Sequence, residues 1–203
     1  MKLKFIIDKK YDLEFLSDKK EAEKIYRKFG KYLNGARVAY QGSWDEINNE
    51  FSGVVEKITG YTWEYKTYFC VVSPIHKGMS NWSGNKIIRS GKENPYIMRK
   101  ITAHELLISH IFTIFEKDFK KENLSDKQKW ALAEISAFAI TGLEKKMLKF
   151  WPWISEEEKY PLNHNYPELY RIQKVLRSKY EKKRNFKKFL EQAIKIIKKE
   201  KWL

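Results

Sequence analysis

Two consecutive apolar stretches contain ionisable residues whose types and spacing could support chemistry. The first spans residues 101–115 and includes the adjacent pair His104 and Glu105. The second spans residues 130–140, where Glu134 is the only charged residue. Burying a carboxylate costs several kcal/mol unless a cation, a hydrogen-bond donor or a metal ion compensates it. Each carboxylate therefore needs a partner from a neighbouring element, and acid–base or metal chemistry would use the same groups.

Helical geometry limits which of these side chains can share a metal ion. Two histidines that bind one metal from a helix are usually four positions apart, about 40° around the axis. The residue at that position after His104 is Ile108, and His110 lies six positions on, about 120° away. A regular helix thus directs the two imidazoles to different faces, and only a local distortion would make His110 a ligand. We interpret His110 as a partly buried histidine.

The elements around these residues are predicted to bring them together. A helix is expected over residues 95–118, after an Asn-Pro start, and another over residues 125–150, after a Ser-x-x-Gln capping box. Because only a short polar segment connects them, the two helices are expected to pack antiparallel. That packing would place Glu134 close to His104 and Glu105.

The His104-Glu105-Leu-Leu pattern, followed thirty residues later by Glu134, resembles the gluzincin metallopeptidases. In that family His-Glu-x-x-His lies on one helix and a glutamate ligand on the next. The order of strands, active-site helix and glutamate helix is also similar, over residues 61–150. The resemblance implies a zincin-like fold in which His104 and Glu134 bind zinc and Glu105 is the general base that activates water.

One position departs from the family pattern, because Ile108 replaces the second histidine. Catalytic zinc normally has three protein ligands and a water, and the matching positions provide two. If His110 completes the site, the resemblance implies peptide-bond hydrolysis by zinc-activated water. If zinc binds weakly or not at all, it implies a pseudo-peptidase that binds a peptide or protein partner. A third interpretation has no site: the pair at 104–105 is hydrogen-bonded core, and a Lys or Arg compensates Glu134.

Further roles follow from the resemblance. Gluzincin-like sites use a downstream His or Tyr to stabilise the oxyanion, which requires a donor about 3 Å from the developing charge. The candidates in the loop after the second helix are His164, Tyr160 and Tyr166. In the family, a strand before the active-site helix holds an extended peptide. Residues 61–73 or 86–89 would be its counterpart. We interpret His76 as a surface loop residue. Residues 78–81 lie where an edge-strand contact with a substrate would be expected, but we interpret them as an ordinary loop.

The rest of the sequence predicts an α+β protein with a short N-terminal sheet and a mainly helical second half. Strands are expected at residues 36–40, 61–74 and 86–89, and residues 1–7 are expected to form either a short strand or an ordered lead-in. Helices are expected at residues 18–32, 43–58, 95–118, 125–150, 167–180 and 186–199. Ser43 is the predicted N-cap of the second helix, with Glu46 completing a capping box. We expect a single domain, residues 1–203, with a zincin-like core at 61–150 and basic helices at 165–203.

The net charge of +15 is concentrated in the C-terminal segment. Residues 171–203 contain thirteen Lys and Arg against three Asp and Glu, a net charge of +10. One interpretation is a solvated lysine face on amphipathic helices. The alternative is a basic helical module that binds nucleic acid or another anionic partner through residues 171–201. The aromatic residues fall on the apolar side of these helices, which favours the solvated face.

Composition limits the class of protein. The single cysteine, Cys70, excludes a disulfide framework and a cysteine-based zinc cluster. No run reaches the roughly 18 apolar residues that span a bilayer, and the first apolar patch is shorter than the about 7–15 residues of a secretory signal. We therefore expect no membrane span and a cytoplasmic location. The sequence does not indicate a substrate or an oligomeric state.

Overall fold

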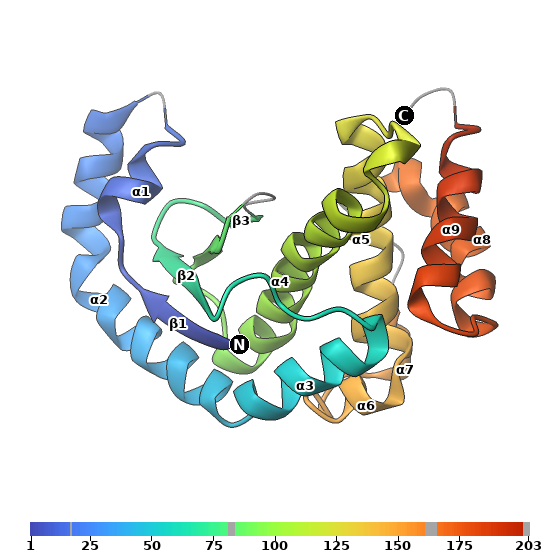
Figure 1. Ribbon diagram of the computed structural model, residues 1–203. Coiled ribbons are helices and arrows are strands. Elements are labelled where there is room, and N and C mark those ends of the chain that lie inside the picture. Colours follow the sequence, from blue (N-terminus) through green and yellow to red (C-terminus); the bar gives the residue numbers. More distant parts are fainter. Residues whose placement is uncertain (17, 81–83, 161–165, 201–203) are drawn as a thin grey trace.

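The computed structural model describes residues 1–16, 18–80, 84–160 and 166–200, and shows an α+β fold (Figure 1). A four-stranded sheet has the order β1-β2-β4-β3. Its strands are β1 (Lys2–Ile6), β2 (Thr67–Ser73), β3 (Gly78–Ser80) and β4 (Lys86–Ser90). The first three in that order are parallel, whereas β3 is an edge strand antiparallel to β4. The predicted strands at residues 61–74 and 86–89 are confirmed, the first in a shorter form, and of the two alternatives for residues 1–7 the strand is confirmed.

The prediction of an ordinary loop at residues 78–81 was wrong for its described part. Gly78, Met79 and Ser80 form β3, in register with Arg89, Ile88 and Ile87 of β4. A three-residue segment that begins with glycine has no alternation to reveal it. Its strand conformation comes from pairing with β4.

The helix α2 (Lys19–Asp45) is a single helix of 27 residues. The predictions that it ends near residue 32, that residues 36–40 form a strand and that Ser43 caps a new helix were all wrong. Its interior glycines each cost roughly 1 kcal/mol of helix stability. The burial of Leu33, Tyr40 and Trp44 on one face offsets that cost.

Tertiary hydrogen bonds explain why this helix continues. The Tyr40 hydroxyl donates to the carbonyl oxygens of Ser90 and Glu93 at 3.1 and 2.9 Å. Ser43 Oγ accepts a hydrogen bond from Arg99 Nε at 3.1 Å. Ser43 is therefore a contact between helices and not a cap. The next helix, α3 (Asn48–Thr59), ends at a left-handed Gly60, close to the predicted end at residue 58.

The helices α4 (Pro95–Asp118) and α5 (Asp126–Leu143) pack antiparallel, as predicted (Figure 1). Asn94 caps α4 by accepting from the Tyr96 amide, and the Ser125–Gln128 capping box starts α5. The prediction that α5 continues to residue 150 was wrong, because it ends at Leu143 and the short α6 (Lys145–Leu148) follows.

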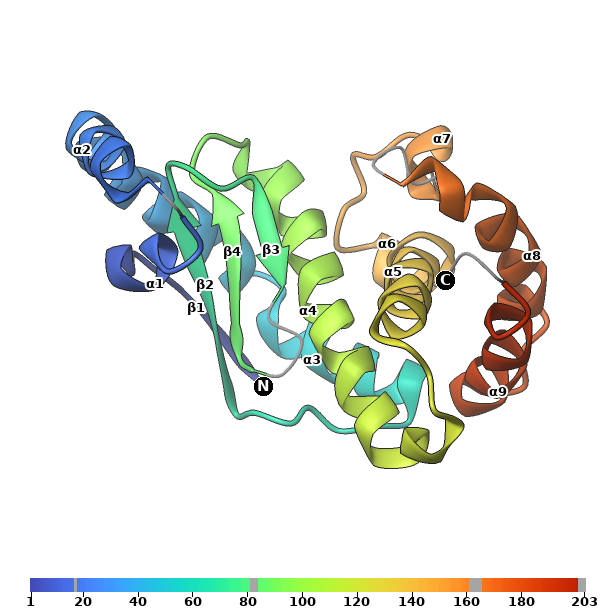
Figure 2. The same cartoon turned by 90° about the horizontal axis from the view of Figure 1, so that it is seen from above.

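Beyond α5, the C-terminal helices form an outer layer (Figure 2). The helices α8 (Tyr170–Glu181) and α9 (Phe186–Ile197) pack on each other and on α5, in agreement with the predicted amphipathic helices. The hydrophobic core is continuous from the sheet through α4 and α5 to this layer. The remaining short elements are α1 (Lys9–Leu13), η1 (Lys120–Glu122), α7 (Glu156–Lys159) and η2 (Pro167–Leu169). In the described part of the chain, no helix is both long and apolar enough to cross a membrane.

Candidate functional site

A cavity of about 400 Å³ lies between the edge of the sheet and the two central helices. Strands β3 and β4 form one wall, α4 and α5 the other, and the segment after α7 contributes one side chain. The residues that line it are Lys77, Gly78, Arg89, Lys100, Ile101, His104, Glu105, Glu134, Phe138, Thr141 and Tyr166. The cavity thus contains all three residues that matched the gluzincin pattern.

His104 and Glu134 meet across the interface between α4 and α5. Their Nε2 and Oε2 atoms are 3.0 Å apart, and both side chains are mostly buried. The Phe138 ring, one turn further along α5, packs on the imidazole with its centroid 4.6 Å away. The predicted approach of Glu134 to His104 is confirmed. In the hydrogen bond the imidazole donates from Nε2 to the carboxylate.

Glu105 is paired with a residue that the sequence analysis did not single out. Arg89 Nη1, from β4, lies 3.1 Å from Glu105 Oε1. Arg89 is 7% exposed, so the pair is formed largely out of water. The guanidinium fits because Gly78 lies opposite Arg89 in the strand register, and a Cβ at position 78 would lie 1.8 Å from Nη1. The only signal in the sequence was a charged residue directly after the apolar pair Ile87-Ile88 of β4.

Of the three candidate oxyanion donors, the structure brings Tyr166 to the cavity. Burial raises the pKa of the Tyr166 phenol, and the nearby carboxylates of Glu134 and Glu105 raise it further. Tyr160 does not line the cavity, because its hydroxyl points to the Gln173 carbonyl oxygen 3.5 Å away. His164 lies outside the residues that the structure describes.

The structure places His110 on a different side of α4, in the core. Its Nε2 atom is 3.2 Å from Thr59 Oγ1, and its ring packs on that of Trp63 at 4.6 Å. Burial lowers the pKa of His110 to about 3, so the imidazole is neutral at physiological pH. The histidine is fully buried, not partly as predicted. Ile108, in the family's second histidine position, is also buried in the core.

The described residues do not complete the zinc ligand set that the resemblance implies. Within residues 1–16, 18–80, 84–160 and 166–200, no three His, Cys, Asp or Glu side chains are grouped so that they could hold a metal ion. His104 and Glu134 provide two donors, whereas catalytic zinc uses three from the protein.

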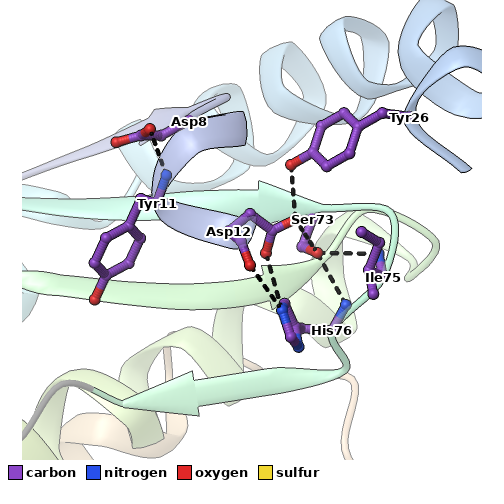
Figure 3. A network of polar contacts seen from close by, with 7 residues as sticks. All are labelled: Asp8, Tyr11, Asp12, Tyr26, Ser73, Ile75 and His76. Carbon is purple, nitrogen blue, oxygen red and sulfur yellow. Dashed lines mark hydrogen bonds and ion pairs between the residues drawn. The ribbon is translucent and has the colours of Figure 1, made fainter. Parts of the chain in front are cut away.

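A second polar network lies at the carboxyl end of β2 (Figure 3). The fully buried Asp12 accepts hydrogen bonds at Oδ2 from Tyr26 Oη at 2.6 Å and from Ser73 Oγ at 2.7 Å. His76 Nε2 is 3.1 Å from the backbone carbonyl oxygen of Asp12 and 3.5 Å from Oδ1 of the Asp12 side chain. His76 belongs to a loop as predicted, but its side chain points inward and is 13% exposed.

The hydrogen bonds of this network indicate a structural role and not a catalytic one. Ser73 Oγ donates to the Asp12 carboxylate and accepts from the backbone amides of Ile75 and His76. In a nucleophilic triad the imidazole would instead bridge the hydroxyl and the carboxylate. The network therefore fixes the turn between β2 and β3, one wall of the cavity, to α1.

Comparison of the chain with family models, curated proteins and solved structures finds no match. The geometry of the cavity is therefore the basis for assigning a function.

Proposed function

We propose that this protein binds a peptide or a segment of a partner protein in the cavity and does not hydrolyse it. In this proposal the domain is zincin-like in layout, with a degenerate metal site. The single observation that supports it most is the ion pair between Arg89 and Glu105 at 3.1 Å.

This ion pair disfavours the hydrolytic mechanism in two ways. A general base must reach the water that it activates, but the Glu105 carboxylate accepts a hydrogen bond from Arg89. The guanidinium is also permanently charged. A divalent cation held by His104 and Glu134 would share the cavity with that positive charge and would be repelled by it. Two ligands and an adjacent cation make a poor zinc site.

The position of β3 supports peptide binding. An edge strand has backbone N–H and C=O groups on its open side, to which an extended peptide can add. Gly78 of β3 lines the cavity, and Ile101 and Phe138 provide apolar surface on the opposite wall. We propose β3 as the peptide-binding edge, instead of residues 61–73 or 86–89, the counterparts that the resemblance implied.

Equilibrium binding tests this proposal. A fluorescently labelled pool of randomised hexapeptides should bind the protein, with the same affinity after metal is removed with a chelator. A triple variant with bulky residues in the cavity wall, Ile101→Trp, Phe138→Trp and Thr141→Trp, should lose binding. Binding that requires added zinc, or binding that persists in the triple variant, would contradict the proposal.

The contacts of the basic helices support a solvated lysine face more than a nucleic-acid module. Lys183, Lys187 and Lys198 form ion pairs of 2.7 Å with Glu144, Asp118 and Glu122, which belong to the body of the domain. The aromatic residues of α8 and α9 that pack inside are Tyr180, Phe186 and Phe189, each 1% exposed. Nucleic acid that bound at low salt, and was lost on changing residues 182, 183, 187 and 188 to alanine, would instead support the alternative.

A further inference from the structure

The charges that line the cavity do not balance. Lys77, Arg89 and Lys100 face two carboxylates, Glu105 and Glu134, which leaves an excess of one positive charge when His104 is neutral. Arg89 is buried and Lys100 is partly buried, whereas Lys77 is exposed. Buried or partly buried charges cost free energy unless an opposite charge compensates them. The cavity is therefore suited to a ligand with one negative charge.

Arg89 has a donor that the described residues do not use. Its Nη1 donates to Glu105, but its buried Nε atom has no hydrogen-bond partner in the described part of the chain. In a guanidinium, Nε and Nη2 lie on the same side and form two parallel donors that match the two oxygens of a carboxylate. A buried donor without a partner is costly, and a ligand that supplies two acceptors would remove that cost.

Two lysines add positive charge on either side of this arginine. Lys100 Nζ donates to the Glu158 carbonyl oxygen at 2.6 Å. Burial lowers the pKa of this lysine, and the nearby Glu158 carboxylate, which is beyond ion-pair distance, partly offsets that effect. Among the described residues, neither Lys77 nor Lys100 forms an ion pair with a carboxylate. Other lysines do, including Lys86, Lys117, Lys129 and Lys183. Both lysines line the cavity from opposite walls.

We infer that the ligand of this cavity presents a carboxylate, which binds the Nε and Nη2 side of Arg89 while Lys77 and Lys100 offset its charge. The inference rests on the proposed peptide-binding function and narrows its ligand to a peptide chain end or an Asp or Glu side chain. A doubly charged phosphate fits less well, because Glu105 and Glu134 would repel its second charge.

Four pools of fluorescently labelled hexapeptides, randomised over neutral residues, test this inference with the wild-type protein. The pools are free C-terminal acids, C-terminal amides, amides with one internal Glu and amides with Gln in its place. A carboxylate bound through charge-assisted hydrogen bonds should strengthen binding by about tenfold or more over the matched neutral pool. Preference for the free acids identifies the chain end, and preference for Glu over Gln identifies the side chain.

The remaining outcomes overturn the inference in distinguishable ways. Equal binding of all four pools would refute the inference that the ligand needs a carboxylate, but it would still support the proposal that the cavity binds peptides. No binding of any pool would overturn peptide binding as well.

Variants of the lysines connect the preference to this cavity. Lys100→Met and Lys77→Met keep most of the length of the side chain and remove its charge, and each should reduce the preference for the carboxylate pools several-fold. The readout is the ratio of affinities between the carboxylate and neutral pools, because both lysines line the cavity and their loss also alters contacts with neutral peptides. Lys92→Met is the matched control, because Lys92 is exposed and does not line the cavity. An unchanged preference in the Lys77→Met, Lys100→Met double variant would overturn the inference.

Discussion

At the scale of single residues, a glycine and an arginine determine the chemistry of the cavity. Glu105 belongs to the motif that suggested a metallopeptidase, but its partner Arg89 lies on a strand sixteen residues earlier. The guanidinium has room only because position 78 lacks a side chain. Neither residue belongs to a motif, so their contact could not be predicted from the sequence. It depends on the register of β3 with β4.

Substitution at position 78 tests this close approach. In Gly78→Ala the new Cβ would displace the guanidinium group of Arg89 and so disturb the ion pair between Arg89 and Glu105. We expect the free energy of unfolding in urea to fall by about 1–3 kcal/mol. Gly42→Ala is the control, because nothing lies within 4 Å of its Cβ position inside α2, and it should gain up to about 1 kcal/mol. Equal effects of the two variants would contradict this account of Gly78.

His110 makes stability depend on pH. Its pKa is about 3 in the folded protein and about 6.5 in an unfolded chain, so the unfolded state binds a proton first as pH falls. Stability is therefore lost between pH 6.5 and 3, by up to about 1.4 kcal/mol per pH unit. His110→Gln should remove this component, so the stability of the wild type relative to the variant should decrease as pH falls from 7 to 5. A difference that stays constant over this range would contradict this account, because it would mean that His110 takes up its proton in the folded protein as readily as in the unfolded chain.

At the scale of elements, the predictions succeeded where local signals were sufficient. Helix α4 follows from its Asn-Pro start, and α5 begins at a capping box. The apolar faces of α8 and α9 likewise repeat with a helical period. The predictions for α2 were wrong because its glycines suggested an end, whereas the buried face that maintains the helix packs on α4 and the sheet. Strand β3 exists only through pairing, so a single segment could not reveal it.

The position of the second histidine in the gluzincin pattern can be restored on α4 in one step. In Ile108→His the new imidazole lies one turn from His104, on the face where the family has its second histidine. We expect zinc affinity, measured by titration calorimetry, to rise on the order of tenfold or more over the wild type. Ile114→His is the control, since it places an equally buried histidine on another face of α4. Equal zinc affinity in both variants would mean that α4 does not present these side chains as proposed.

At the scale of the whole molecule, α5 is the central element. It packs on α4 on the side of the sheet and on α8 and α9 on the other side (Figure 2). Glu134 lies on the side of α5 that faces His104 of α4. The overall α+β class and the helical second half were predictable, because composition and periodicity report which faces are buried. The cavity was predictable only at His104, Glu105, Glu134 and Tyr166. Its strand wall and its cationic side chains come from tertiary packing.

The central claim is that the protein binds peptides without hydrolysing them, and the most direct test is to look for cleavage of bound peptides. The wild-type protein, incubated with a randomised peptide pool and excess zinc, can be analysed by mass spectrometry for new chain ends, beside a Glu105→Gln variant. We predict that the peptides remain intact with both proteins while binding to the wild type persists. Cleavage that requires zinc and is lost in Glu105→Gln would contradict the account, because Glu105 would then act as a base in spite of Arg89.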